Sequence, residues 1–183
     1  MEGVDLMGMY LIGALLLLAL FYALSKLKAG NEIYSRFGLK ESTYTLVSSD
    51  LGGKKSTIKL SRFGINGIAD AVFKANAGKE IIVGEFKSRK FRGAVRLCEF
   101  YQVLLYMGHL AERYPDHVIK GRLAYADSTQ GVYFDPQVYE ALVGMRKEML
   151  QALGTRRLTN STPLHKRMKV ASLNKHLKLT AAM

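Results

Sequence analysis

The chain has few of the residues from which disulfides and thiolate metal sites are built. Among its 183 residues there is a single cysteine, Cys98, and there are only four histidines. These counts exclude an internal disulfide, a cysteine-ligated zinc site and a four-cysteine iron–sulfur cluster. We therefore expect no iron–sulfur cofactor, and we interpret Cys98 as a small buried apolar residue.

Acidic residues are also scarce relative to basic ones. The chain has 15 Asp and Glu against 27 Lys and Arg, which gives a formal net charge of +12. Such an excess predicts attraction to a polyanion, either a nucleic acid or an anionic membrane surface, and charge alone does not choose between them. Hydrophobic residues make up 49% of the chain, which is enough for a folded core.

Charge is absent from residues 6–25, and the centre of this stretch, Leu11–Phe21, is strongly apolar. A helix needs roughly 20 such residues to cross a bilayer, so the stretch predicts a transmembrane helix. Glu2 and Asp5 precede it, which favours an uncleaved single-pass anchor over a signal peptide. The positive-inside rule then places the C-terminal body in the cytoplasm, at a bacterial inner membrane, because basic residues follow the stretch: Lys26, Lys28, Arg36 and Lys40.

Beyond the expected anchor, apolar periodicity and turn residues predict alternating helices and strands. A short helix at 32–39 precedes a hairpin of strands 43–51 and 57–63, whose turn is Gly52-Gly53, and a second hairpin of strands 65–74 and 80–87. A helix at 92–114, strands at 121–127 and 131–134, and a helix at 136–153 complete the body. The predicted fold class is α/β, with a mixed β-sheet core flanked by helices and preceded by a single transmembrane helix.

Composition divides the chain into three parts. We expect residues 1–28 to form the membrane anchor, 29–153 to form the folded domain, and 154–183 to form a basic C-terminal tail. The tail has basic residues but no acidic residue, so we expect it to be mobile and to bind either DNA or the cytoplasmic leaflet.

The second hairpin carries charged residues inside apolar sequence. Glu85 and Lys87 share one face of their strand because side chains alternate, and an antiparallel partner strand can bring Asp70 beside them. Two carboxylates form a hard-oxygen site suited to Mg²⁺ or Mn²⁺, and a neighbouring lysine can orient a metal-bound water or stabilise developing negative charge. The alternative is an ordinary solvated sheet face with a surface ion pair, and spacing alone does not exclude it.

The helix after this hairpin has one polar stripe. Its members recur at three- and four-residue steps, which places Gln102 and Tyr106 side by side. The stripe consists of Glu99, Gln102, Tyr106, His109 and Arg113.

In order and spacing, the segments Gly67–Asp70, Glu85–Ser88, Gln102–Tyr106 and Gly121–Tyr125 resemble the RecB-like branch of the PD-(D/E)XK nucleases, which includes the CRISPR-associated adaptation nucleases. The resemblance covers roughly residues 61–135. It implies a restriction-endonuclease-like fold and a Mg²⁺ or Mn²⁺ cofactor. Its implied site roles are metal binding by Asp70, Glu85 and the carbonyl of Phe86, catalysis by Lys87, and positioning of the lysine, the ligands or DNA by Gln102 and Tyr106.

The sequence departs from this family in three respects. Ala69 stands where the family name has proline, which removes no ligand. The cysteines that bind an iron–sulfur cluster in many adaptation nucleases are missing. The upstream acidic or histidine ligand of many RecB-like exonucleases has only Glu32 and Glu41 as candidates, so exonuclease behaviour is less supported than metal-dependent cutting.

A basic cluster follows the second hairpin, consisting of Arg89, Lys90, Arg92 and Arg96. At the mouth of an active-site groove these side chains would contact DNA phosphates, and their alternative role is that of a merely soluble surface.

The residues and the resemblance together predict a Mg²⁺-dependent deoxyribonuclease at the inner face of the membrane, acting in DNA repair, transfer or defence. The first alternative is a non-catalytic module on the same fold that tethers DNA to the membrane. The second is an adaptor of a membrane complex, with the basic tail on lipid.

Overall fold

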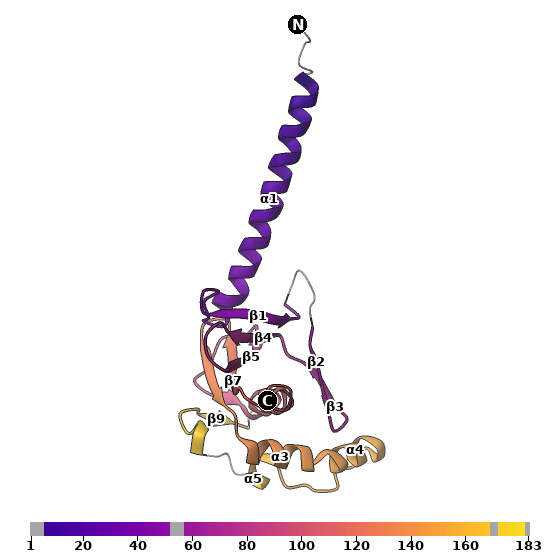
Figure 1. Ribbon diagram of the computed structural model, residues 1–183. Coiled ribbons are helices and arrows are strands. Elements are labelled where there is room, and N and C mark those ends of the chain that lie inside the picture. Colours follow the sequence, from indigo (N-terminus) through magenta and orange to yellow (C-terminus); the bar gives the residue numbers. More distant parts are fainter. Residues whose placement is uncertain (1–5, 52–56, 169–171, 182–183) are drawn as a thin grey trace.

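A five-stranded sheet forms the centre of the computed structural model, which describes residues 6–51, 57–168 and 172–181. Its strand order is β1-β4-β5-β7-β8, with β5 and β7 parallel and the other neighbours antiparallel (Figure 1). The expectation of a mixed α/β core is therefore confirmed. The strands are β1 (Tyr44–Ser49), β4 (Ala71–Ala75), β5 (Glu80–Lys87), β7 (Val118–Tyr125) and β8 (Thr129–Tyr133).

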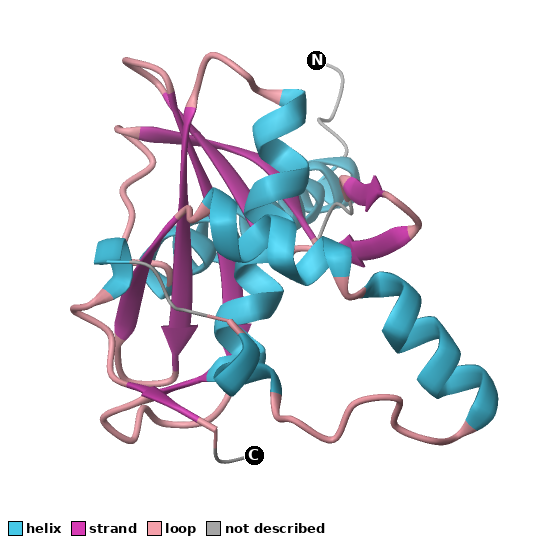
Figure 2. Ribbon diagram, turned by 90° about the horizontal axis from the view of Figure 1, so that it is seen from below, coloured by secondary structure: helices cyan, strands magenta, loops and turns pink. Residues whose placement is uncertain are grey.

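Helices and two small strand pairs surround this sheet. Figure 2 shows helices in front of one face of the fanned strands, with the C-terminal end beside a short strand pair. The helices are α1 (Leu6–Arg36), α2 (Leu97–Arg113), α3 (Pro136–Gly144), α4 (Arg146–Thr155), α5 (Leu164–Arg167) and the 3₁₀ turn η1 (Ser172–Asn174). The small pairs are β2 (Lys59–Arg62) with β3 (Ile65–Ile68), and β6 (Val95–Arg96) with β9 (Leu179–Thr180).

The central strand β5 is apolar on both faces because both faces are covered. Ile81 and Val83 join the larger core cluster, in which α2 contributes Phe100 and Leu104. Ile82 belongs to a second cluster on the opposite face. A run of apolar residues in a strand is typical of this position between two layers.

The second cluster is built by the C-terminal end of α1. Tyr34 and Phe37 pack on Phe73 of β4, with ring centroids 5.4 and 5.6 Å apart. The expected short helix at 32–39 is therefore the last part of one longer helix that ends at Arg36.

In the described part of the chain, no helix is both long enough and apolar enough to cross a membrane. The predictions of a transmembrane helix ahead of the sheet and of single-pass membrane localisation are therefore wrong. The C-terminal end of α1 instead packs on the sheet through Tyr34. Residues 1–5 of the expected anchor lie outside the described residues.

The strand pairing differs from prediction in the first hairpin and agrees in the second. β1 pairs with β4, and β2 pairs with β3 in a separate two-stranded sheet, so the expected pairing of 43–51 with 57–63 is wrong. The Gly52-Gly53 turn lies outside the described residues. The antiparallel pairing of β4 with β5 is confirmed. The expected strand 65–74 is interrupted at Ala69 and Asp70, which separates β3 from β4.

The C-terminal segment packs on the domain instead of forming a free tail. Met168 and Leu177 are buried in the larger core cluster, and β9 pairs with β6 immediately before α2. The expected helix at 136–153 is divided at Met145 into α3 and α4. Asp135 caps α3 by accepting hydrogen bonds from the backbone of the first turn.

A substitution at Gly84 tests how tightly β5 packs against Phe37 in the second cluster. A Cβ atom added there would lie 2.6 Å from the ring of Phe37, which is fully buried. We expect Gly84→Ala to lower the free energy of unfolding by about 1–3 kcal/mol, measured by denaturant titration. The matched control is Gly131→Ala in β8, where a Cβ meets nothing within 4 Å. Equal effects of the two substitutions would contradict this packing.

Candidate active site

Asp70 lies at the break between β3 and β4, directly before the pair Ala71 and Gly84 in the sheet register. Its Oδ2 accepts a hydrogen bond of 2.6 Å from the backbone N–H of Phe86. This bond fixes the carboxylate beside the C-terminal part of β5. Its Oδ1 is the oxygen left for another partner.

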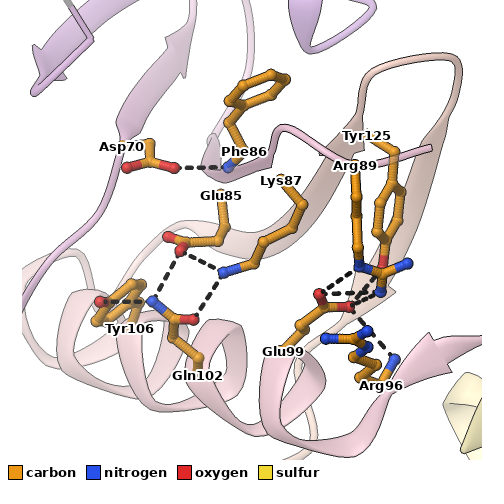
Figure 3. Close-up of polar contacts among 10 residues, drawn as sticks. All are labelled: Asp70, Glu85, Phe86, Lys87, Arg89, Arg96, Glu99, Gln102, Tyr106 and Tyr125. Carbon is orange, nitrogen blue, oxygen red and sulfur yellow. Dashed lines mark hydrogen bonds and ion pairs between the residues drawn. The ribbon is translucent and has the colours of Figure 1, made fainter. Parts of the chain in front are cut away.

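Glu85, Lys87, Gln102 and Tyr106 form one hydrogen-bonded network (Figure 3). The Lys87 Nζ donates to Glu85 Oε1 at 2.9 Å and to Gln102 Oε1 at 3.0 Å. The Gln102 Nε2 donates to Glu85 Oε1 at 2.7 Å and to the Tyr106 hydroxyl at 3.1 Å. The amide of Gln102 therefore orients both the carboxylate and the ammonium group.

The close approach of α2 to β3 depends on a glycine. A Cβ atom at Gly67 would lie 2.3 Å from the ring of Tyr106, a distance that no side chain can occupy. Gly67 therefore allows the helix to bring Gln102 and Tyr106 to the strands that carry the acidic residues.

Burial determines the electrostatics of the two carboxylates. Desolvation raises the pKa of Glu85, which is only 5% exposed, and the nearby charge of Asp70 raises it further, while Lys87 and Gln102 oppose the rise. Desolvation also raises the pKa of Asp70, against the hydrogen bond from Phe86 and the charge of Lys87. Two such groups favour a nearby cation, because a cation stabilises their charged forms.

These residues fit a small divalent cation. Among the described residues, the buried Glu85 Oε2 has no hydrogen-bond partner, which leaves one carboxylate oxygen for a ligand. Asp70 supplies a second hard oxygen, and Mg²⁺ binds through one or two carboxylates with waters completing the shell. No group of three acidic, histidine or cysteine side chains suited to a metal occurs among the residues described. The role of the Phe86 carbonyl stays a prediction.

The predicted basic cluster divides into two kinds of side chain. The Arg89 guanidinium makes a bidentate ion pair with Glu99, whose side chain is only 7% exposed, at distances of 2.8–3.2 Å. The Tyr125 hydroxyl and the Arg96 N–H also donate to Glu99. Arg89 is therefore a structural residue, Arg96 is half-buried at the start of α2, and the exposed members are Lys90 and Arg92.

The polar stripe of α2 faces the protein more than solvent. Glu99 and His109 are buried, and His109 Nε2 lies 3.1 Å from the carbonyl of Ile65 in β3. Helical periodicity correctly predicted that these polar residues share one face of α2. It did not predict that the β2–β3 hairpin covers part of that face. Cys98, expected to be buried, is exposed.

Sequence reasoning missed Asp50 and gave Arg36 another role. The backbone N–H of Asp50 donates to the carbonyl of Asp70 at 3.0 Å, and its charge raises the pKa of Asp70. The Arg36 guanidinium lies 4.4 Å from the ring centroid of Phe86 and lowers that pKa. Of the expected upstream candidates, Glu32 pairs with Arg36, and the backbone carbonyl of Glu41 accepts a hydrogen bond from the side-chain amide of Asn76. No local motif marks Asp50, since the β1–β4 pairing brings it there.

Comparison with known proteins gives little to add to this geometry. No known protein family matches the sequence, and no curated protein matches it. Among solved structures, the chain is similar to one described as "Crystal structure of SSO0001", with 19% identity and a TM-score of 0.38. The similarity covers 83% of this chain and 64% of the other, so this chain spans less than two thirds of that protein's length.

The ion pair of Arg89 with Glu99 predicts that replacing Arg89 destabilises the fold, whereas replacing the adjacent Lys90 does not. Arg89→Ala removes the cation from the buried Glu99, and we expect a loss of about 3 kcal/mol in the free energy of unfolding. Lys90→Ala, at an exposed position, is expected to change it by less than about 0.5 kcal/mol. Chemical unfolding of both variants measures the difference. Similar stabilities would show that Arg89 is free to act as a surface residue.

Proposed function

We propose that this protein is a metal-dependent deoxyribonuclease that hydrolyses phosphodiester bonds with Mg²⁺ or Mn²⁺. The observation that carries the proposal is the network in which Gln102 holds Glu85 and Lys87 together, beside Asp70. An exposed ion pair on a solvated sheet would not need a helix to orient it, and Glu85 would not be buried. The geometry therefore favours a reactive site over the solvated-face alternative.

Each residue has a role that follows from its position. Asp70 and Glu85 would hold the cation, which when bound supplies positive charge to the phosphate and lowers the pKa of water. Lys87 is placed to donate hydrogen bonds to the phosphate oxygens and so to stabilise developing negative charge. Gln102 holds the side chains of Lys87 and Glu85 in place. The Tyr106 hydroxyl accepts a hydrogen bond from the Gln102 amide.

The resemblance to RecB-like PD-(D/E)XK nucleases supports the same assignment. The residues that carry it, Asp70, Glu85, Lys87, Gln102 and Tyr106, are those that meet at this site. A net charge of +12 suits a polyanionic substrate. The proposed processes are DNA repair, transfer or defence.

Cleavage assays with site variants test the proposal. Lys87→Met is expected to reduce Mg²⁺-dependent cleavage of linear and circular DNA at least about 100-fold, because transition-state charge loses its donor. Lys74→Met, at an exposed position in β4, is the matched control and should keep full activity. Undiminished cleavage by Lys87→Met would contradict the assignment of this site as the active site. DNA binding without cleavage by the wild type would favour a non-catalytic binding module.

Cation binding can be measured without catalysis. Saturating Mg²⁺ is expected to raise the melting temperature of the wild type by about 2–5 °C, since a ligand at roughly tenfold its Kd stabilises by about 1.4 kcal/mol. The shift should disappear in Asp70→Asn and remain in Asp116→Asn, which changes an exposed carboxylate elsewhere. A shift of the same size in all three proteins would place the bound cation outside this site.

A further inference from the structure

A pocket leads away from the catalytic network along α2. It has a volume of about 280 Å³ and lies between β3 and the helix, with Gln102 and Tyr106 in its wall. Ile65 and Leu105 also line it, and both of them line a second, larger cavity. The two cavities are therefore neighbours that share Ile65 and Leu105.

The larger cavity, which we call the α4 groove, is lined by apolar residues, here called its floor, and by four arginines, here called its rim. Its volume is about 830 Å³. Several floor residues remain exposed, with Leu153 at 69% and Leu158 at 79%. The floor includes Leu142, Met145, Met149, Leu153, Leu158 and Leu164. The rim consists of Arg146, Arg156, Arg157 and Arg167.

The rim has an excess of positive charge. Glu148, the acidic residue of the cavity lining, is paired with Arg167 at 2.6 Å. Arg156 and Arg157 are exposed, and among the described residues no acidic side chain pairs with either of them. An apolar floor under unpaired guanidinium groups complements a ligand with apolar faces on one side and anionic groups on the other.

An exposed aromatic residue, Phe63, directly precedes a glycine that contacts the rim of this groove. Phe63 is in the turn of the β2–β3 hairpin, which points toward α4 in Figure 1, and is 51% exposed. The next residue, Gly64, lies against the guanidinium of Arg146 on the rim. Phe63 has a φ of +52°, a conformation that bulky residues rarely adopt.

The hairpin that carries this ring is held in place. The Arg62 Nε lies 2.7 Å from Glu112 of α2, and its guanidinium donates to the Tyr139 hydroxyl of α3 at 3.2 Å. The same guanidinium stacks on the Phe63 ring at 4.5 Å. Arg62 therefore links the hairpin that carries the ring to both α2 and α3.

From these observations we propose that the α4 groove is a second nucleic-acid site, which binds the single strand that runs from the catalytic network past Leu105 and Ile65. This inference rests on the proposed nuclease function. Unpaired bases offer apolar faces to the floor and to Phe63, and their phosphates face the arginines. A duplex keeps its bases stacked inside and offers the floor no such faces.

The test measures binding of a labelled 20-nucleotide oligothymidine by the full chain in EDTA, where cleavage does not occur. We expect the double variant Arg156→Glu/Arg157→Glu to bind at least tenfold more weakly. The salt dependence should fall by about 0.7 in log–log slope for each lost phosphate contact. Phe63→Ala should weaken binding about fivefold or more while leaving the melting temperature nearly unchanged.

The matched control is Lys74→Glu/Lys79→Glu, which makes the same change in net charge at exposed positions near the opposite end of β5. It should change the affinity less than twofold. Equal losses in both double variants would overturn the proposal, because the effect would then come from overall charge. Tighter binding of a duplex of the same length that is equally sensitive to the rim variant would overturn it as well.

Two further results separate this inference from the proposed function. If the rim variant binds the oligonucleotide normally but changes the oligomeric state, the groove is an interface with a second copy, and the inference fails while the nuclease assignment is untouched. If the wild type cleaves no DNA yet loses single-strand binding in the rim variant, the nuclease proposal fails and the groove is retained as a binding site.

Discussion

The burial of one carboxylate sets the geometry of the site. Glu85 lies on the central strand with 5% of its surface exposed, and a charged group in such surroundings requires charged or hydrogen-bonded partners. Lys87 and Gln102 provide them, and this contact fixes the distance between β5 and α2. Strand β3 must then lie close to α2, and Gly67 leaves room there for the ring of Tyr106.

A second buried acidic residue holds the other side of the same arrangement. Glu99, in the first turn of α2, accepts hydrogen bonds from Arg89, just beyond β5, and from Tyr125 at the end of β7. The segment from 85 to 99 is thus tied at both of its ends. The start of α2 is therefore held by polar contacts in addition to the apolar face that the helix buries.

Much of the central architecture followed from local sequence. Alternation predicted that Glu85 and Lys87 share a face, the β4–β5 hairpin was marked by its turn, and helical spacing put Gln102 beside Tyr106. Contacts between distant segments could not be derived in this way. The β1–β4 pairing that brings Asp50 near Asp70 and the pairing of β9 with β6 depend on tertiary packing. The apolar stretch near the N-terminus was interpreted from composition as an anchor, and the described helices do not support that interpretation.

The short strand β9 gives the last part of the chain an influence on chemistry that its composition does not suggest. It pairs with β6, the two residues directly before the helix that carries Gln102. Asn174, a few residues before β9, is almost fully buried. Its side-chain amide accepts a hydrogen bond from the backbone N–H of Tyr133 and donates one to the Tyr133 carbonyl. Removing the basic C-terminal segment to improve solubility would therefore remove the strand that pairs with the residues directly before α2. A fusion partner attached there would lie next to the same strand pair.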